Sequence, residues 1–176
     1  MGLDHVTVKL RLPLIGEIEG QWRPDEAERL AAWEMYVELV TRIAVVELQP
    51  DEGSLREALS SLYSLFATTR LILRKYGPDV AKPKRGSTLS FGYLAVAVLN
   101  SVLRPVLAKW HPMLLDYESR RSPSISLIEH EMRWDKGQEL RNELARVRSI
   151  LIDYAKLLAD VAGVPPLVID KLPEGK

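Results

Sequence analysis

Arg104 and His111, in the segment LRPVLAKWHP, form the one pair of residues in this sequence with catalytic potential. Seven residues make about two turns of an α-helix, so on an unbroken helix both side chains lie on one face. The arginine can then hold a phosphate group while the imidazole takes up or releases a proton. A second interpretation is structural: His111, next to Pro112, ends a helix, and Arg104 donates to an ion pair. We favour the structural interpretation.

The spacing of an arginine, six residues and a histidine is similar to the motif of the HEPN ribonucleases, which are helical bundles that pair two such motifs across a dimer. The resemblance covers residues 104–111 of the 176, and Pro105 stands where those proteins usually carry a polar residue. It implies a ribonuclease in which Arg104 and His111 are the catalytic residues. This ribonuclease is kept as an alternative to a non-enzymatic function.

The sequence lacks a complete motif for several other classes of enzyme. It contains no cysteine, which excludes thiolate metal sites and cysteine nucleophiles, and its histidines are His5, His111 and His130. The dinucleotide, P-loop, zincin and hydrolase-elbow motifs are missing. A di-iron bundle needs a glutamate three residues before each histidine ligand, and Ala108 and Leu127 occupy those positions. We therefore expect no metal site and no cofactor.

Charge is balanced over the whole chain but uneven along it. Lys plus Arg and Asp plus Glu both number 24. Residues 1–50 hold nine acidic against five basic side chains, whereas residues 70–111 hold eight basic side chains against one acid. The loop cations Lys82, Lys84 and Arg85 are candidate partner-binding residues, for nucleic-acid phosphate or for an acidic protein surface. The interpretation that we favour has opposite charges facing each other within the fold or between copies.

Residues 1–22 predict a β-hairpin. Val6, Val8, Leu10 and Leu12 alternate with polar residues, which is the two-residue period of a half-buried strand. An isolated two-stranded ribbon is only marginally stable in water, so its apolar face must be covered. We expect Val6, Val8 and Leu10 to bind a partner chain or a second copy, which could extend the sheet through its open edges.

Four longer segments have the apolar period of amphipathic helices, and loops with Pro or Gly separate them. We predict these helices over residues 25–48, 54–76, 88–117 and 126–162. Pro105 and Pro112 predict kinks in the third helix, and Gly137 could bend the fourth. We predict a loose C-terminal tail over residues 163–176 and a single domain over residues 1–176. Its predicted class is mainly α, an up-and-down four-helix bundle with a short N-terminal β-hairpin.

The first predicted helix carries two apolar stripes. One runs through Leu30, Trp33 and Val37, and the other runs beside it through Met35 and Leu39. A helix that is apolar over so much of its circumference has neighbours on more than one side. This pattern favours a protein that makes contacts beyond its own core.

We therefore predict a non-enzymatic helical-bundle protein that contacts a protein partner or further copies of itself, as an adaptor, a regulatory subunit or a structural subunit of a larger complex. The HEPN-like ribonuclease is the first alternative. The second is a nucleic-acid-binding module that uses the basic region 70–111 through its 82–85 loop. The N-terminus shows no export or transit signal, so we expect a cytoplasmic, bacterial-type protein. The uncharged stretch over 86–103 predicts a buried helix and no membrane span.

Overall fold

The fold is taken from a computed structural model that describes residues 5–42, 52–84 and 86–167. It is mainly helical with an N-terminal hairpin, and so it confirms the predicted class. The elements are β1 (Val6–Leu12), β2 (Gly16–Trp22), α1 (Glu26–Val40), α2 (Leu55–Tyr76), the 3₁₀ helix η2 (Pro78–Ala81), α3 (Phe91–Val98), the π-helical turn η3 (Leu99–Leu103), α4 (Arg104–Ser119), α5 (Leu127–Met132) and α6 (Gly137–Ala162).

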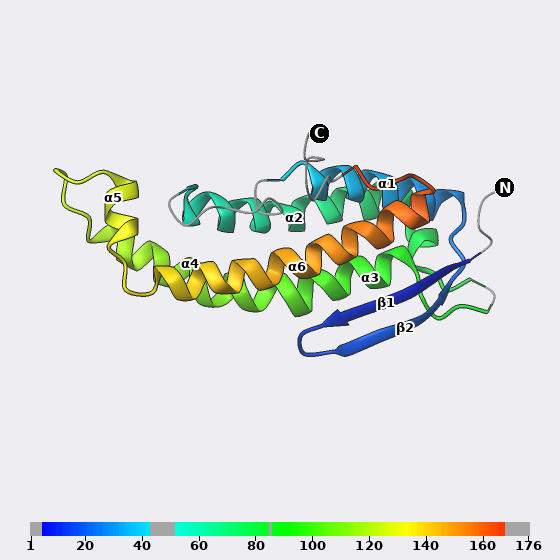
Figure 1. The fold of residues 1–176 in the computed structure, drawn as a ribbon. Coiled ribbons are helices and arrows are strands. Elements are labelled where there is room, and N and C mark those ends of the chain that lie inside the picture. Colours follow the sequence, from blue (N-terminus) through cyan, green and yellow to red (C-terminus); the bar gives the residue numbers. More distant parts are fainter. Residues whose placement is uncertain (1–4, 43–51, 85, 168–176) are drawn as a thin grey trace, which may run out of the picture.

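The β-hairpin packs its apolar face onto helices of the same chain. The antiparallel register places Val6 opposite Trp22 and Leu10 opposite Ile18. The side chains of Val6, Val8, Leu10 and Trp22 are all buried. Strand β1 contacts α6, and Figure 1 shows the hairpin lying alongside the bundle near α3 and α6. The sheet and the helices therefore share one hydrophobic core.

Helix α1 begins at a capping box. The Asp25 side chain accepts a hydrogen bond from the Glu28 amide at 2.9 Å, and a Glu28 carboxylate oxygen accepts one from the Asp25 amide at 3.2 Å. This reciprocal pair satisfies two amides that the helix itself leaves without acceptors. The helix ends at Val40. The prediction extended it to residue 48, and residues 43–48 lie outside the described part of the chain.

Helices α3 and α4 form one continuous helix through both prolines. The π-helical turn η3 precedes Pro105, and within it the Arg104 amide donates to the Leu99 carbonyl, five residues back. In an ordinary α-helix the ring of Pro105 would crowd the carbonyl of Ser101, so a wider turn at this place relieves the crowding. At Pro105 the helix therefore continues, with one π-helical turn in place of the predicted interruption.

The same helix, Phe91–Ser119, is the one helix in the described ranges that is long and apolar enough to cross a membrane. In the fold, 56% of its most apolar window is buried against the rest of the chain. Leu94, Val98 and Leu103 are among its core residues. This burial fits the predicted central helix of a bundle.

The fourth predicted helix is divided in two, which corrects the prediction of one helix over 126–162. Ser126 caps α5, where its side-chain oxygen accepts a hydrogen bond from the Glu129 amide at 3.1 Å. The helix then stops at Met132 and α6 begins at Gly137. The break turns Trp134 inward, where its ring stacks on Tyr117 at 5.4 Å. Trp134 is only 8% exposed there.

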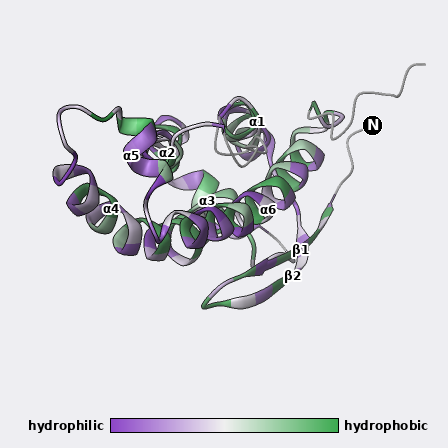
Figure 2. Cartoon of the chain, turned by 60° about the vertical axis from the view of Figure 1, so that its left-hand side comes forward, coloured by the Kyte–Doolittle hydropathy of each residue, from purple (hydrophilic) through white to green (hydrophobic). Residues whose placement is uncertain are grey.

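The long helices run side by side, and α5 lies at the far end of the bundle (Figure 1). Helix α2 ends at Gly77, whose positive φ of 73° is the conformation that favours glycine and marks the predicted stop. Figure 2 shows hydrophobic and hydrophilic residues following one another around the helices. Each helix can therefore bury one side while the other side stays in water.

Candidate functional site

Arg104 and His111 lie on the side of α4 that faces α2. The Arg104 guanidinium lies over the ring of Phe66, 5.2 Å from its centroid. The His111 ring meets the Tyr63 ring edge to face, with centroids 5.7 Å apart. Arg104 is exposed and His111 is half-buried. The structure thus places both predicted residues on one helix face, against the same neighbouring helix.

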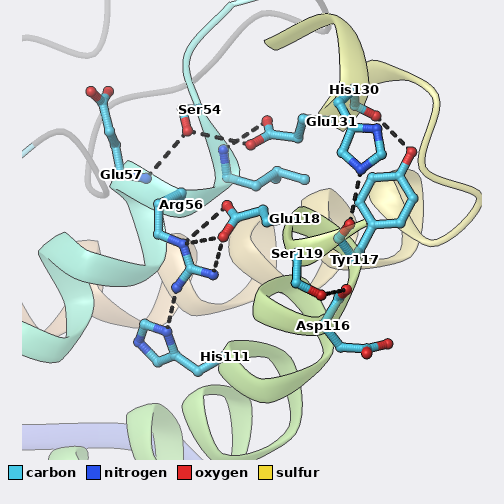
Figure 3. Close-up of polar contacts among 11 residues, drawn as sticks. Ser54, Arg56, Glu57, His111, Asp116, Tyr117, Glu118, Ser119, His130 and Glu131 are labelled. Carbon is cyan, nitrogen blue, oxygen red and sulfur yellow. Dashed lines mark hydrogen bonds and ion pairs between the residues drawn. The ribbon is translucent and has the colours of Figure 1, made fainter. Parts of the chain in front are cut away.

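His111 belongs to a polar network that joins α2 to α4 (Figure 3). Its Nδ1 lies 3.0 Å from a terminal nitrogen of Arg56. The same guanidinium donates to both carboxylate oxygens of Glu118, with a shortest distance of 2.8 Å. Because arginine can only donate, His111 Nδ1 must be the acceptor, and the neutral ring carries its proton on Nε2. The network therefore runs from His111 through Arg56 to Glu118.

The environment of His111 favours the neutral imidazole. Burial lowers the pKa of His111 below its ordinary value, the Arg56 guanidinium lowers it further, and Glu118 raises it in part. Its Nε2 is shielded from solvent and has no hydrogen-bond partner in the structure. In this structure, one ring nitrogen of His111 therefore accepts a hydrogen bond and the other is shielded from solvent.

The Arg104 side chain is held separately from His111. Its Nε donates to the Asn100 side-chain oxygen at 3.0 Å, and its guanidinium lies over Phe66. Two helical turns along α4 correspond to about 10 Å between the two positions. Together with the covered imidazole, this arrangement supports a structural role for His111 in the contact between α2 and α4. Two details of the structural interpretation are wrong, because α4 continues past Pro112 to Ser119 and, among the described residues, Arg104 donates to a neutral side chain and not to an ion pair.

Sequence reasoning missed the partners that organise this end of the bundle. Arg56 and Glu118 lie 62 positions apart in the chain. Glu131, which is buried, accepts from the Leu55 amide at 2.9 Å and from Ser54 Oγ at 3.3 Å, so α5 supplies a cap for the start of α2 (Figure 3). No local spacing in the sequence announces these contacts, because each joins two different helices.

The predicted basic loop is largely neutralised by acids. Lys82 pairs with Asp79 at 2.8 Å, and Lys84 pairs with Asp25 at 2.7 Å. The hydrogen bond to the Asp25 carboxylate is the main cause that raises the pKa of Lys84. Arg85 lies outside the described residues. The two lysines therefore present less net charge to a partner than their spacing in the sequence indicates.

Two further cations of the basic region also face acids. Lys75 pairs with Glu34, and Lys109 pairs with Glu139 at 2.8 Å. Glu34 and Asp25 both come from the acidic N-terminal part of the chain. At these positions opposite charges meet within the fold, which is the arrangement that we favoured from the charge pattern.

The predicted partner-binding residues of the hairpin are core residues of this chain. Val6 is 5%, Val8 0% and Leu10 2% exposed. A partner that binds the hairpin would have to use its backbone edges or its turn, where Leu14 has a positive φ of 69° and is exposed. The apolar face itself is already covered by helices.

A groove with an apolar lining lies between α1 and α2 and has a volume of about 330 Å³. It is lined by Trp33, Glu34, Val37, Glu38, Thr68, Leu71, Ile72 and Lys75. On its edges Trp33 is 38% and Leu71 67% exposed, and Leu30 continues the stripe on α1 with 46% exposure. This groove contains one of the two apolar stripes predicted for the first helix.

In the described ranges, no group of three or more His, Asp or Glu side chains is arranged to hold a metal ion. Comparisons of the chain with protein-family models, with curated proteins and with solved structures find no match. The functional conclusion therefore depends on the geometry alone.

Proposed function

We propose that this chain is a non-enzymatic helical-bundle protein that acts through protein contacts, as an adaptor, regulatory or structural subunit, and that the groove between α1 and α2 is its contact face. One observation carries the proposal. After the core has formed, α1 still holds an apolar stripe, Leu30, Trp33 and Val37, on its outer side.

The two apolar sides of α1 have different surroundings. Ala31, Met35 and Leu39 are at most 2% exposed and fill the core. Trp33 and Val37 line the groove instead. Apolar surface removed from water contributes about 25 cal/mol per Å², so covering the outer stripe would be favourable. Tryptophan is also enriched among the residues that dominate binding energies at interfaces.

The occupant that fits the groove is the apolar face of an amphipathic helix from another polypeptide. Charged side chains on the groove already have partners: Glu34 pairs with Lys75 and accepts from the Tyr76 hydroxyl at 2.6 Å, and Glu38 pairs with Arg42 at 2.6 Å. The surface is therefore electrically balanced and does not demand a charged partner. Two adjacent helices with apolar edges form the kind of groove that accepts a third helix.

A non-catalytic role is supported by the state of His111. A ribonuclease that uses Arg104 and His111 needs an imidazole nitrogen that reaches the substrate. Here Nδ1 accepts from Arg56, and Nε2 is covered. We expect neither the wild-type protein nor His111→Ala to cleave RNA. A strong wild-type activity that His111→Ala removes without unfolding the protein would reverse this ranking.

The contact face is tested with Trp33→Glu and Leu71→Glu, compared with Ile128→Glu. Ile128 is 60% exposed but lies on α5, away from the groove. Light scattering gives the mass of the purified protein, and quantitative mass spectrometry identifies polypeptides recovered with the tagged protein from its native host. We expect both groove variants to lose a dimer or a bound polypeptide that Ile128→Glu retains.

Circular dichroism checks that all three variants remain folded. If the folded groove variants keep every partner of the wild type, or if the wild type is a monomer with no bound polypeptide, the groove is not the contact face. A mass of two chains would identify the occupant as a second copy.

A further inference from the structure

We propose that a second surface, on the opposite side of α2 from the groove, binds single-stranded nucleic acid. This surface, the arginine face, consists of Arg70, Arg74 and Tyr63 on α2 and Arg104 on α4. All four side chains are exposed. It does not depend on the contact face proposed above, because it shares no residue with the α1–α2 groove.

Helical spacing places the α2 members of this face on one side. Tyr63 and Arg70 are seven residues, or about two turns, apart, and Arg74 follows after one further turn. Arg56 lies two turns before Tyr63 in the other direction and contacts α4 through His111. The side of α2 that carries these residues is therefore the side next to α4.

Contacts across the two helices place Arg104 on the same face. Its guanidinium lies over Phe66, and Tyr63 meets His111. As positions in α2 increase from Tyr63 to Phe66, their partners in α4 decrease from His111 to Arg104, so the two helices run antiparallel. Continuing this register brings Arg70 close to the N-terminal end of α4, where Arg104 begins the helix.

The arginine face keeps its positive charge. Within the described residues, Arg70 and Arg74 form no ion pair, and Arg104 bonds only to the neutral side chain of Asn100. By contrast, Arg56 is neutralised by Glu118, and Lys84 is neutralised by Asp25. Among the described residues, the unpaired positive charge of the 70–111 region therefore lies on helices. The loop cations Lys82 and Lys84 are paired with acidic side chains.

Guanidinium groups and an aromatic ring are the combination that single strands require. The arginine fork can donate two parallel hydrogen bonds to a phosphate. The Tyr63 ring, which is 64% exposed, offers a surface on which a base can stack. Because stacking is available to every base, we expect binding that tolerates different sequences.

The width of the face argues against duplex DNA. The major groove of B-DNA, about 12 Å wide, admits a single helix. Here the cations lie on two neighbouring helices, whose axes are about 8–10 Å apart. With their side chains, the two helices together are wider than this groove. A flexible strand can follow such a face. From Tyr63 to Arg74, α2 extends for about 16 Å, enough for roughly two to three nucleotides.

The test measures fluorescence anisotropy of a labelled oligouridylate of about 20 nucleotides, at about 50 and about 200 mM salt. We expect binding whose log K falls with log salt with a slope of about −2, since three phosphate contacts are made. Arg70→Ser/Arg74→Ser should weaken binding by at least about tenfold, and Tyr63→Ala by about tenfold, at low salt.

The matched control is Arg120→Ser/Arg146→Ser, which removes the same charge from exposed positions paired with Asp116 and Glu143. It should bind like the wild type, and circular dichroism should show all variants folded. The proposal is overturned if the oligonucleotide does not bind at low salt, or if the control loses as much affinity. Equal binding of a duplex, or equal competition by polyglutamate, would contradict it in favour of duplex nucleic acid or an acidic protein surface.

Discussion

His111 shows how one residue acquires a role from its partners. In the sequence it suggests a proton carrier, yet the fold gives it Arg56 as a donor and covers its second nitrogen. An imidazole in this setting is a hydrogen-bond acceptor between two helices. Its protonation would place a positive charge beside a guanidinium inside a shielded contact.

The lowered pKa of His111 makes stability depend on pH. Between the folded-state pKa and the ordinary value of 6.5, the unfolded chain binds the proton more tightly, so protonation favours unfolding. The stabilisation is complete above pH 6.5 and is lost as the pH falls. In urea titrations at pH 7.5 and 5.0, the free energy of unfolding should fall more in the wild type than in His111→Gln. Equal losses would contradict this prediction, because they would show that the pKa of His111 is the same in the folded and the unfolded chain.

At the scale of elements, the buried carboxylate of Glu28 ties three of them together. Its Oε1 accepts from the Trp22 indole nitrogen at 3.2 Å and from the Phe91 amide at 3.0 Å, while Oε2 accepts from the Asp25 amide. Strand β2, the start of α1 and the start of α3 thus meet at one side chain. Burial raises the pKa of Glu28, and these hydrogen bonds lower it in part.

We expect Glu28→Ala to lower the free energy of unfolding by about 3 kcal/mol, because two buried donors then lack an acceptor. Glu28→Gln keeps an oxygen for Trp22 and Phe91 and gives up the bond from Asp25, so its loss should be smaller. Urea unfolding monitored by circular dichroism measures both variants. Losses of equal size would mean that the carboxylate charge, and not the pair of shared hydrogen bonds, holds these elements together.

At the scale of the whole molecule, the hairpin and the bundle form one folding unit. The strands would be marginal by themselves, but Val8 and Trp22 are fully buried against helices. The same residues that we expected at an interface with another chain supply the interior of this one. Our proposal therefore assigns partner contacts to the groove between α1 and α2 and not to the apolar face of the hairpin.

Val8→Ala should therefore cost about 2 kcal/mol of unfolding free energy, because it leaves a cavity in the shared core. Lys9→Gln, one position along on the exposed side of the strand, should change stability by no more than about 0.5 kcal/mol. Chemical unfolding compares the two variants, and light scattering gives their mass. A Val8→Ala protein of unchanged stability that loses an oligomer would instead place the hairpin at an interface.

The local elements can be predicted from the sequence, because their signals repeat within a few residues. The alternation of Val6, Val8 and Leu10 indicated a strand, and loops with Pro or Gly separated the segments that have the apolar period of helices. These features depend on backbone periods and on hydrogen bonds between neighbours in the chain. The class of fold followed from them.

Which surfaces and side chains stay accessible depends on how the helices and the hairpin pack against one another. The tertiary structure selected one of two similar apolar stripes on α1 for the core and left Trp33 outside. Packing brings Arg56, 55 positions away, within hydrogen-bond distance of His111 Nδ1, and it places Arg104 over Phe66. Such contacts join side chains from different helices, and their formation depends on how whole elements pack. Residue spacing within a single helix specifies a face, but it does not specify which neighbour covers that face.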